Sequence, residues 1–222
     1  GLFSPPPPIL AVALVSSARR DKERRMVDWC VHFWAKLTML SMGVKPRVEG
    51  LHNLPDVNEP VMYIPNHTSF LDILMLSGFV PRPFKYISKI EILRIPLVGW
   101  AMRMARHVAI RRGSIRSQLE TLRVANERLK AGSSIVTFAE GTRSRDGRLQ
   151  QFKRGAVKMA SGAGVRIVPV SVANLHRWHP SSAVLPLGRP NDVVIKIHPP
   201  VETKGRKDAD VQQEVFNAIN GG

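Results

Sequence analysis

The stretch VMYIPNHTSFLD at residues 61–72 brings a buried strand, a turn and the start of a helix together. Val61 to Ile64 form an apolar run that ends at Pro65, as expected of a short strand buried on both faces. Apolar residues resume over 70–78 and predict a helix there. The polar residues between them occupy a strand-to-helix turn, a common place for functional side chains.

His67 and Asp72 in this turn are five residues apart. On one continuous helix that separation is about 140°, and the two side chains would diverge. If His67 precedes the helix and Asp72 lies in its first turn, the carboxylate can hold one imidazole nitrogen and leave the other as a base. Ser69-x-x-Asp72 is also a capping-box pattern, which would make Asp72 a helix-start residue only. The spacing alone favours capping.

Strand-like and helix-like segments alternate along the rest of the chain. This alternation predicts an α/β fold, with one domain and a mostly buried mixed sheet flanked by helices. Pro169 interrupts one strand and favours an edge or pocket-wall position for it. Strands are expected at 84–88, 107–110, 134–138, 167–172 and 193–197, and helices at 97–105, 114–130, 153–161 and 208–219.

A second polar motif, FAEGTRSR at 138–145, directly follows a predicted strand. Gly141 lets the backbone approach a ligand closely, and Thr142 offers a hydroxyl and an N–H. Arg143 carries a planar fork that suits a phosphate. A polar turn, helped by Asp146-Gly147, is an equally good interpretation of this segment.

Two further cationic segments lie next to predicted helix starts. Arg111-Arg112 precede the helix expected at 114–130, and Lys153-Arg154 lie at the start of the helix expected at 153–161. Cations beside a helix N-terminus can form an anion site. Ordinary surface charge is the favoured alternative for both.

The composition is that of a folded domain, but its net charge is strongly positive. The 222 residues include 33 Lys and Arg against 17 Asp and Glu, a formal charge of +16. Residues 81–160 hold 18 of these cations and five acids. Such a surface favours an anionic partner, which leaves nucleic acid, an acidic membrane face or a phosphorylated substrate. A single Cys excludes a disulfide framework and a cysteine-based zinc site, and His176 with His179 lack further metal ligands nearby.

The N-terminal part divides into two segments. Residues 1–18 carry no charge, but the apolar run at 9–15 is far shorter than the roughly 20 residues of a spanning helix, so we interpret it as the stub of an anchor or targeting segment. A helix is expected over 24–42. We assign residues 1–47 to this stub and helix, and 48–222 to the main domain.

The helix expected at 24–42 has an amphipathic pattern. Asp28, His32 and Lys36 form one polar stripe, and an apolar set that includes Trp34 and Leu37 lies largely on the other side. Basic residues at its start and aromatic residues on its apolar face suit a helix lying in a membrane interface. Packing on its own domain is the alternative, and the two are compatible.

Four blocks of the chain occur in the order found in one enzyme family. They are NHTSFLD (66–72), VAIRR (108–112), FAEGTRS (138–144) and IVPVSV (167–172). Over residues 27–200 the chain resembles the glycerolipid acyltransferases, specifically the 1-acyl-sn-glycerol-3-phosphate (lysophosphatidate) acyltransferases. Its sequence is most similar to the plastid and bacterial members. Ala139 stands where the family usually has Pro. Arg106 or His107 stands near the family's usual Gly, which affects the wall of the acceptor pocket.

The resemblance implies transfer of an acyl group from acyl-CoA or acyl carrier protein to the sn-2 hydroxyl of lysophosphatidate, giving phosphatidate. His67 would be the general base and Asp72 would orient it. A thioester is already activated, so no metal or other cofactor is expected besides this co-substrate. Glu140 would repel phosphate, so we expect it to orient Arg143 or accept a glycerol hydroxyl. The substrate-binding residues implied by the resemblance are Glu140, Gly141, Thr142, Arg143, Arg112 and Lys153.

The expected partners are lysophosphatidate, the acyl thioester, an anionic membrane surface and, as one possible donor, acyl carrier protein. A membrane-associated location in a plastid or at a bacterial inner membrane is favoured over the endoplasmic reticulum. Glycerol 3-phosphate and other lysophospholipids are the rival acceptors. A nucleic-acid-binding protein and a non-catalytic membrane-surface protein are alternatives from other classes. With only two Tyr and no aromatic-rich strand, nucleic acid is not expected as a partner.

Overall fold

The computed structural model describes residues 25–91, 102–103, 105–110, 115–183, 187–188 and 192–221. The anchor stub, Arg112 and most of the helix expected at 97–105 lie outside these residues. The helices are α2 (Arg25–Ser41), the 3-10 turn η1 (Leu51–Asn53), α3 (Asp72–Phe79), α5 (Ile115–Lys130), α6 (Gly155–Ala163), α7 (Leu175–Trp178) and α8 (Asp208–Asn220). The strands are β1 (Arg47–Glu49), β2 (Met62–Pro65), β3 (Phe84–Lys89), β4 (Val108–Ile110), β5 (Ser134–Val136), β6 (Ile167–Ala173) and β7 (Val194–Ile197).

The strands form one sheet in the order β1-β7-β6-β2-β5-β3-β4. Neighbours from β6 to β4 run parallel, β7 runs antiparallel to β6, and β1 is parallel to β7. This confirms the predicted α/β fold with a mixed sheet. Because β6, β2 and β5 are adjacent and parallel, their carboxyl ends lie side by side at one edge of the sheet.

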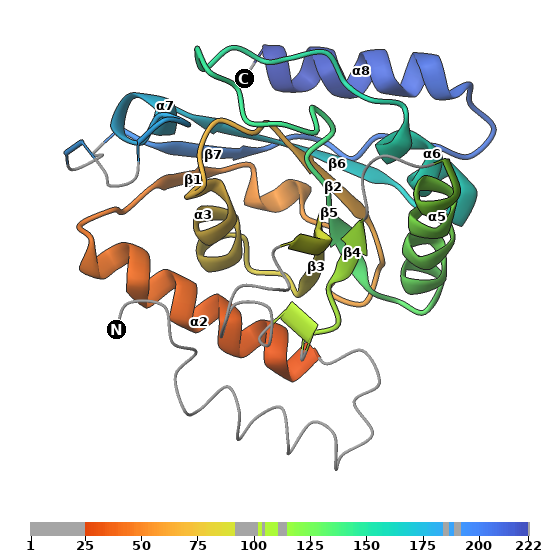
Figure 1. The fold of residues 1–222 in the computed structure, drawn as a ribbon, viewed down its shortest axis with the longest axis horizontal. Helices are drawn as coiled ribbons and strands as arrows, with labels where there is room; N and C mark the ends of the chain where they lie inside the picture. Colours follow the sequence, from red (N-terminus) through yellow and green to blue (C-terminus); the bar gives the residue numbers. More distant parts are fainter. Residues whose placement is uncertain are drawn as a thin grey trace.

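Helices cover both faces of the sheet, and the residues around β2 show why. Val61 and Tyr63 belong to a buried cluster that also contains residues of α2 and α3, whereas Met62 and Ile64 belong to a second cluster with residues of α5, α6 and α8. Alternate residues of a strand point to opposite faces, so an apolar run with no polar interruption is what a doubly covered strand requires. Figure 1 shows α8 on one side of the sheet and α2 on the other.

The edge position predicted for the strand that contains Pro169 was wrong. β6 has partners on both sides, pairing Pro169 with Ile64 of β2 and Val170 with Ile197 of β7. The Pro169 carbonyl still accepts the N–H of His198 at 3.0 Å. β7 ends at Ile197, so the missing N–H of Pro169 falls where that ladder stops. A proline can thus occupy an inner strand beside the end of its neighbour.

α2 packs on its own domain, and two of the three residues of its polar stripe face inward. Asp28 and His32 are buried, whereas Lys36 is exposed. The buried ammonium of Lys85 on β3 contacts both Asp28 carboxylate oxygens, at 2.6 and 2.8 Å.

Close packing against α3 holds the same helix. The Nδ1 atom of His32 lies 2.8 Å from the Ser77 carbonyl of α3. Gly78 makes the approach of the two helices possible, because a Cβ atom there would lie 2.7 Å from the backbone nitrogen of Lys36. Among the described residues, no helix combines the length and the apolar character needed to cross a membrane.

Candidate active site

His67 and Asp72 meet at the carboxyl edge of the sheet. His67 lies in the turn after β2, and Asp72 is the first residue of α3. The His67 Nδ1 atom lies 2.9 Å from Asp72 Oδ2. The Asp72 side chain is fully buried, and 16% of the His67 side chain is exposed. The two side chains are therefore arranged as a base and its orienting carboxylate, with part of the imidazole open to solvent.

Asp72 also holds the turn that leads into α3. Its Oδ2 atom accepts the backbone N–H groups of Thr68 at 2.7 Å and Ser69 at 2.8 Å. The Ser69 hydroxyl accepts the N–H of Leu71 at 3.1 Å rather than that of Asp72, so the reciprocal bonds of the predicted capping box are only half formed. An ionised carboxylate only accepts hydrogen bonds, so His67 donates from Nδ1 and keeps the Nε2 lone pair as the basic site.

The segment after β5 contacts His67 from the other side. The rings of His67 and Phe138 stack at 3.8 Å between centroids with 20° between planes. The His67 N–H donates to Glu140 Oε1 at 2.6 Å, and the His67 carbonyl accepts the N–H of Ser144 at 2.7 Å. The first and third sequence blocks are thus joined at the histidine itself.

Glu140 is 3% exposed and uses both carboxylate oxygens on backbone groups. Its Oε2 atom accepts the N–H of Gln150 at 2.9 Å. Burial raises the pKa of Glu140 to about 7, and this effect outweighs the opposing one of the two N–H donors. Within the described part of the chain no hydrogen bond joins Glu140 to Arg143, so the carboxylate is directed to His67 and Gln150 rather than to the arginine.

Lys153 lies over the turn at Gly141. Gly141 has φ +76°, and a Cβ atom there would lie 2.8 Å from the Lys153 Nζ atom. The backbone N–H of Lys153 donates to the Ala139 carbonyl at 2.9 Å, which fixes the backbone of this lysine to the loop. The left-handed backbone at 141 favours glycine, and the Lys153 side chain occupies the space where a Cβ atom would lie.

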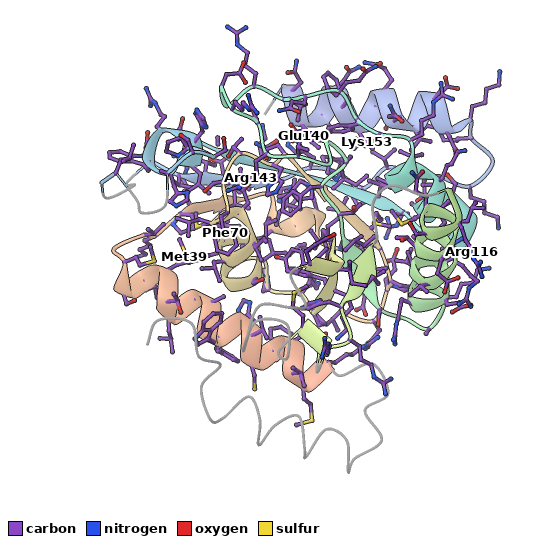
Figure 2. All side chains as sticks on the ribbon, viewed as in Figure 1. Met39, Phe70, Arg116, Glu140, Arg143 and Lys153 are labelled. Atoms are coloured by element: carbon purple, nitrogen blue, oxygen red, sulfur yellow. The ribbon has the colours of Figure 1, made fainter. Side chains whose placement is uncertain are left out.

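The remaining predicted binding residues give a mixed result. Thr142 and Arg143 are exposed, and the Thr142 hydroxyl lies 3.4 Å from Gln150 Oε1. Arg143 makes no hydrogen bond or ion pair with another residue among those described, so its guanidinium is available to a ligand. Figure 2 labels Glu140, Arg143 and Lys153 in one region and Arg116 of α5 well apart from them. Arg112 lies outside the described residues, although β4 ends just before it.

Ser69 and His179 contribute to the site and were not predicted. The Ser69 hydroxyl lies 2.8 Å from Nδ1 of His179, a buried residue just after α7. No spacing in the sequence connects residues 110 positions apart, so the sequence gives no indication of this contact. The sequence presents His179 only as a candidate metal ligand, together with His176. In the described ranges no group of three or more His, Cys, Asp or Glu side chains could hold a metal ion.

Asn66 is a further residue without a predicted role. Its side-chain amide donates to the Val172 carbonyl at 3.0 Å and accepts the Val172 N–H at 2.7 Å. This pair of bonds joins the turn after β2 to β6. The only indication of such a role in the sequence was that Asn66 is a polar residue within the motif at 66–72. The turn after β2 is therefore held on two sides, and Arg143 and Lys153 belong to the segment that contacts His67.

Comparisons with known proteins agree with this geometry. Residues 45–173 match the sequence model of a family described as Acyltransferase. The chain is 42% identical over 174 residues to a chloroplastic 1-acyl-sn-glycerol-3-phosphate acyltransferase of Arabidopsis thaliana, covering 77% of this chain and 48% of that protein. It is 33% identical over 145 residues to a 1-acyl-sn-glycerol-3-phosphate acyltransferase of Pseudomonas aeruginosa, covering 65% and 55% of the two chains. The chain thus spans about half the length of these curated relatives.

A solved structure is also similar. The crystal structure of the 1-acyl-sn-glycerophosphate acyltransferase of Thermotoga maritima superimposes with a TM-score of 0.83 at 30% identity, covering 96% of this chain and 85% of that one. The curated relatives include chloroplastic and bacterial proteins. The similarity therefore extends over nearly the whole fold as well as the sequence blocks.

Proposed function

The chain belongs to the acyltransferase family, and from that premise we propose that it transfers an acyl group from an acyl thioester to the sn-2 hydroxyl of lysophosphatidate, forming phosphatidate. The observation that carries the proposal is the 2.9 Å bond between His67 and Asp72 beside the exposed Arg143 and Lys153. The names of the relatives from Arabidopsis thaliana and Pseudomonas aeruginosa support this choice of acceptor.

His67 acts as the general base in this reaction. Its Nε2 atom takes the proton of the sn-2 hydroxyl, and Asp72 stabilises the imidazolium that forms through the bond to Nδ1. The alkoxide oxygen attacks the thioester carbonyl, the new C–O bond forms, and the C–S bond of the tetrahedral intermediate breaks. The departing thiolate takes the proton back from Nε2. General-base assistance contributes about 10²–10⁴ in rate, which corresponds to about 3–5 kcal/mol.

The acceptor phosphate is the group that places the hydroxyl beside His67. Arg143 supplies a planar fork and Lys153 an ammonium, and both belong to the segment that contacts the histidine. Gly141 and Thr142 provide close backbone approach and a hydroxyl, and Arg112 is a further cation for the same phosphate. Binding energy from this remote group holds the reacting oxygen in position.

The donor is an acyl thioester carried by CoA or by acyl carrier protein. Its carbonyl is already activated, so the chemistry needs a base and correct placement rather than a covalent enzyme nucleophile. The donor is a co-substrate, and the proposal includes no other cofactor.

The outward face of α2 meets the membrane that holds the lipid substrate. Phe33, Leu37 and Leu40 are spaced four and three residues apart and are 61%, 67% and 41% exposed, so they form one apolar stripe. Such a stripe together with the net positive charge suits an anionic bilayer surface. The similarity to chloroplastic and bacterial relatives favours a plastid or bacterial inner membrane.

An acceptor panel tests the proposed reaction. Purified protein is mixed with one labelled acyl-CoA and, separately, with lysophosphatidate, glycerol 3-phosphate or lysophosphatidylcholine, and the lipid products are separated. We expect labelled phosphatidate from lysophosphatidate, and none with the His67→Ala variant. A product from glycerol 3-phosphate alone would move the assignment to that acceptor. No product with any acceptor would overturn it.

Vesicle flotation tests the membrane face. We expect binding to vesicles that contain anionic lipid, weakened by Phe33→Gln with Leu37→Gln and unchanged by the control Glu127→Gln on α5. Equal binding of all three proteins would contradict the role of α2. Retardation of nucleic acid without vesicle binding would favour the nucleic-acid alternative.

A further inference from the structure

The third sequence block contains an acidic residue that the proposed mechanism does not use. Glu140 is 3% exposed, and each of its carboxylate oxygens already accepts a backbone N–H group. A ligand phosphate would be repelled by this charge. A glycerol hydroxyl would have to reach an oxygen that is sealed from solvent and already hydrogen bonded. The side chain is therefore poorly placed to touch a substrate.

What Glu140 does contact is the backbone of the catalytic histidine. The 2.6 Å bond from the His67 N–H to Oε1 is shorter than the usual 2.9–3.0 Å of neutral backbone bonds. On the other side of the same residue, the Ser144 N–H donates to the His67 carbonyl at 2.7 Å. Both polar backbone groups of His67 are thus held by the segment that carries Arg143.

The second carboxylate oxygen of Glu140 contacts the far end of the same loop. Glu140 Oε2 accepts the N–H of Gln150 at 2.9 Å, so the carboxylate closes the loop from 140 to 150 around Arg143. The stacked rings of His67 and Phe138 add a third contact between this loop and the histidine. A shift of the loop would therefore displace the imidazole and the phosphate-binding residues together.

We propose that Glu140 is a positioning residue, whose carboxylate clamps the His67 backbone to the phosphate-binding loop, the loop at 140–150 that carries Arg143. The clamp sets the distance between the catalytic base and the bound phosphate. The inference rests on the proposed function for its catalytic consequence, but the clamp itself is a property of the folded chain. It replaces a substrate-binding role for this residue with a structural link between two halves of the site.

Steady-state kinetics of Glu140→Gln test the role. The amide would turn an NH₂ group toward one of the two N–H donors, so one bond of the clamp is lost. We expect kcat to fall at least tenfold while the KM for lysophosphatidate changes less than twofold, because imidazole placement affects the transition state more than binding. The matched control Glu127→Gln, an exposed position on α5, should leave both unchanged. A raised KM at unchanged kcat would overturn the proposal in favour of substrate binding.

An NMR titration tests the clamp without relying on turnover. In the wild-type protein we expect the backbone amide signal of Gln150 to move as the Glu140 carboxyl titrates. This movement should vanish in Glu140→Gln, where the signals of the His67 backbone amide and ring should also shift. A Gln150 movement that persists in Glu140→Gln, or unchanged His67 signals, would overturn the clamp. If the wild type transfers no acyl group to lysophosphatidate, the proposed function fails while this titration still decides the clamp.

Discussion

Two buried aspartates, each paired with a nitrogen base, lie at opposite edges of the sheet. Asp72 contacts His67 beyond the carboxyl end of β2, whereas Asp28 of α2 contacts Lys85. Lys85 is the second residue of β3 and lies near the amino end of that strand. The His67 side chain is 16% exposed and the Lys85 side chain 1%. Both pairs join a carboxylate to a nitrogen group, but they differ in exposure to solvent.

The difference separates a reactive pair from a structural one. Asp72 is held by two backbone N–H groups as well as by the imidazole, so one nitrogen of His67 stays available to a substrate. Asp28 accepts twice from the buried ammonium of Lys85, and neither side chain is more than 5% exposed. We infer that the carboxyl edge of the sheet carries the chemistry, and that the amino edge fixes which face of α2 points outward.

Removing the imidazole is expected to have the largest effect. His67→Ala should lower turnover of lysophosphatidate by about 10²–10⁴, with little change in the melting temperature, because the side chain is at the edge of the core. Product formation and thermal unfolding are the measurements. Asp72→Ala should lose both activity and stability, since it removes two hydrogen bonds of the turn as well as an orienting group. Intact turnover in His67→Ala would leave Asp72 with a structural role in the turn alone.

Breaking the other pair should cost stability instead. Lys85→Met leaves the Asp28 carboxylate buried without its ammonium, and we expect a loss of about 3–5 kcal/mol in the free energy of unfolding. The double variant Asp28→Leu with Lys85→Met should recover most of this loss, because it removes both charges. Denaturant unfolding measures the effect. An equally destabilised double variant would mean that packing, and not charge, was lost.

The raised pKa of Glu140 predicts a pH-dependent difference in stability. The folded state holds the Glu140 proton up to about pH 7, whereas an unfolded chain releases it near the ordinary value of 4.5. The stability from this group is therefore full below 4.5 and is lost as the pH rises through 7. We expect the wild type to lose up to about 3 kcal/mol relative to Glu140→Gln over this range. Parallel stability curves for the two proteins would contradict the raised pKa.

The smallest expected effect is on acceptor binding. Arg143→Ala should raise the KM for lysophosphatidate about tenfold, or about 1.4 kcal/mol, because one charge-assisted contact to the phosphate is lost. The value of kcat should change little. Arg116→Ala, which removes an exposed arginine from α5, is the control and should leave KM unchanged. An unchanged acceptor KM in Arg143→Ala would exclude its role as the phosphate ligand.

The sequence predicted most elements of the fold because their patterns are local. The apolar run at 61–64 and the periodicity at 114–130 agree with β2 and α5 to within one or two residues. The short strand β1 and the four-residue α7 were missed, since segments of three or four residues carry too little periodicity. The motif at 66–72 contains His67 and Asp72, which hydrogen bond to each other in the structure, although its spacing alone favoured a capping role.

Other features depended on contacts between distant parts of the chain. The inward orientation of Asp28 depends on Lys85, which lies 57 residues away, because a buried carboxylate needs a partner of opposite charge. The inner position of Pro169 depends on where β7 ends.

The sequence by itself determined which residues could do chemistry, since side-chain type and strand-to-helix position are properties of short segments. Tertiary structure alone decided that Glu140 binds the histidine backbone and that Asn66 pairs with Val172 of β6. These outcomes require atoms of separate segments to lie within about 3 Å of each other, a distance that only the packing of adjacent parallel strands sets.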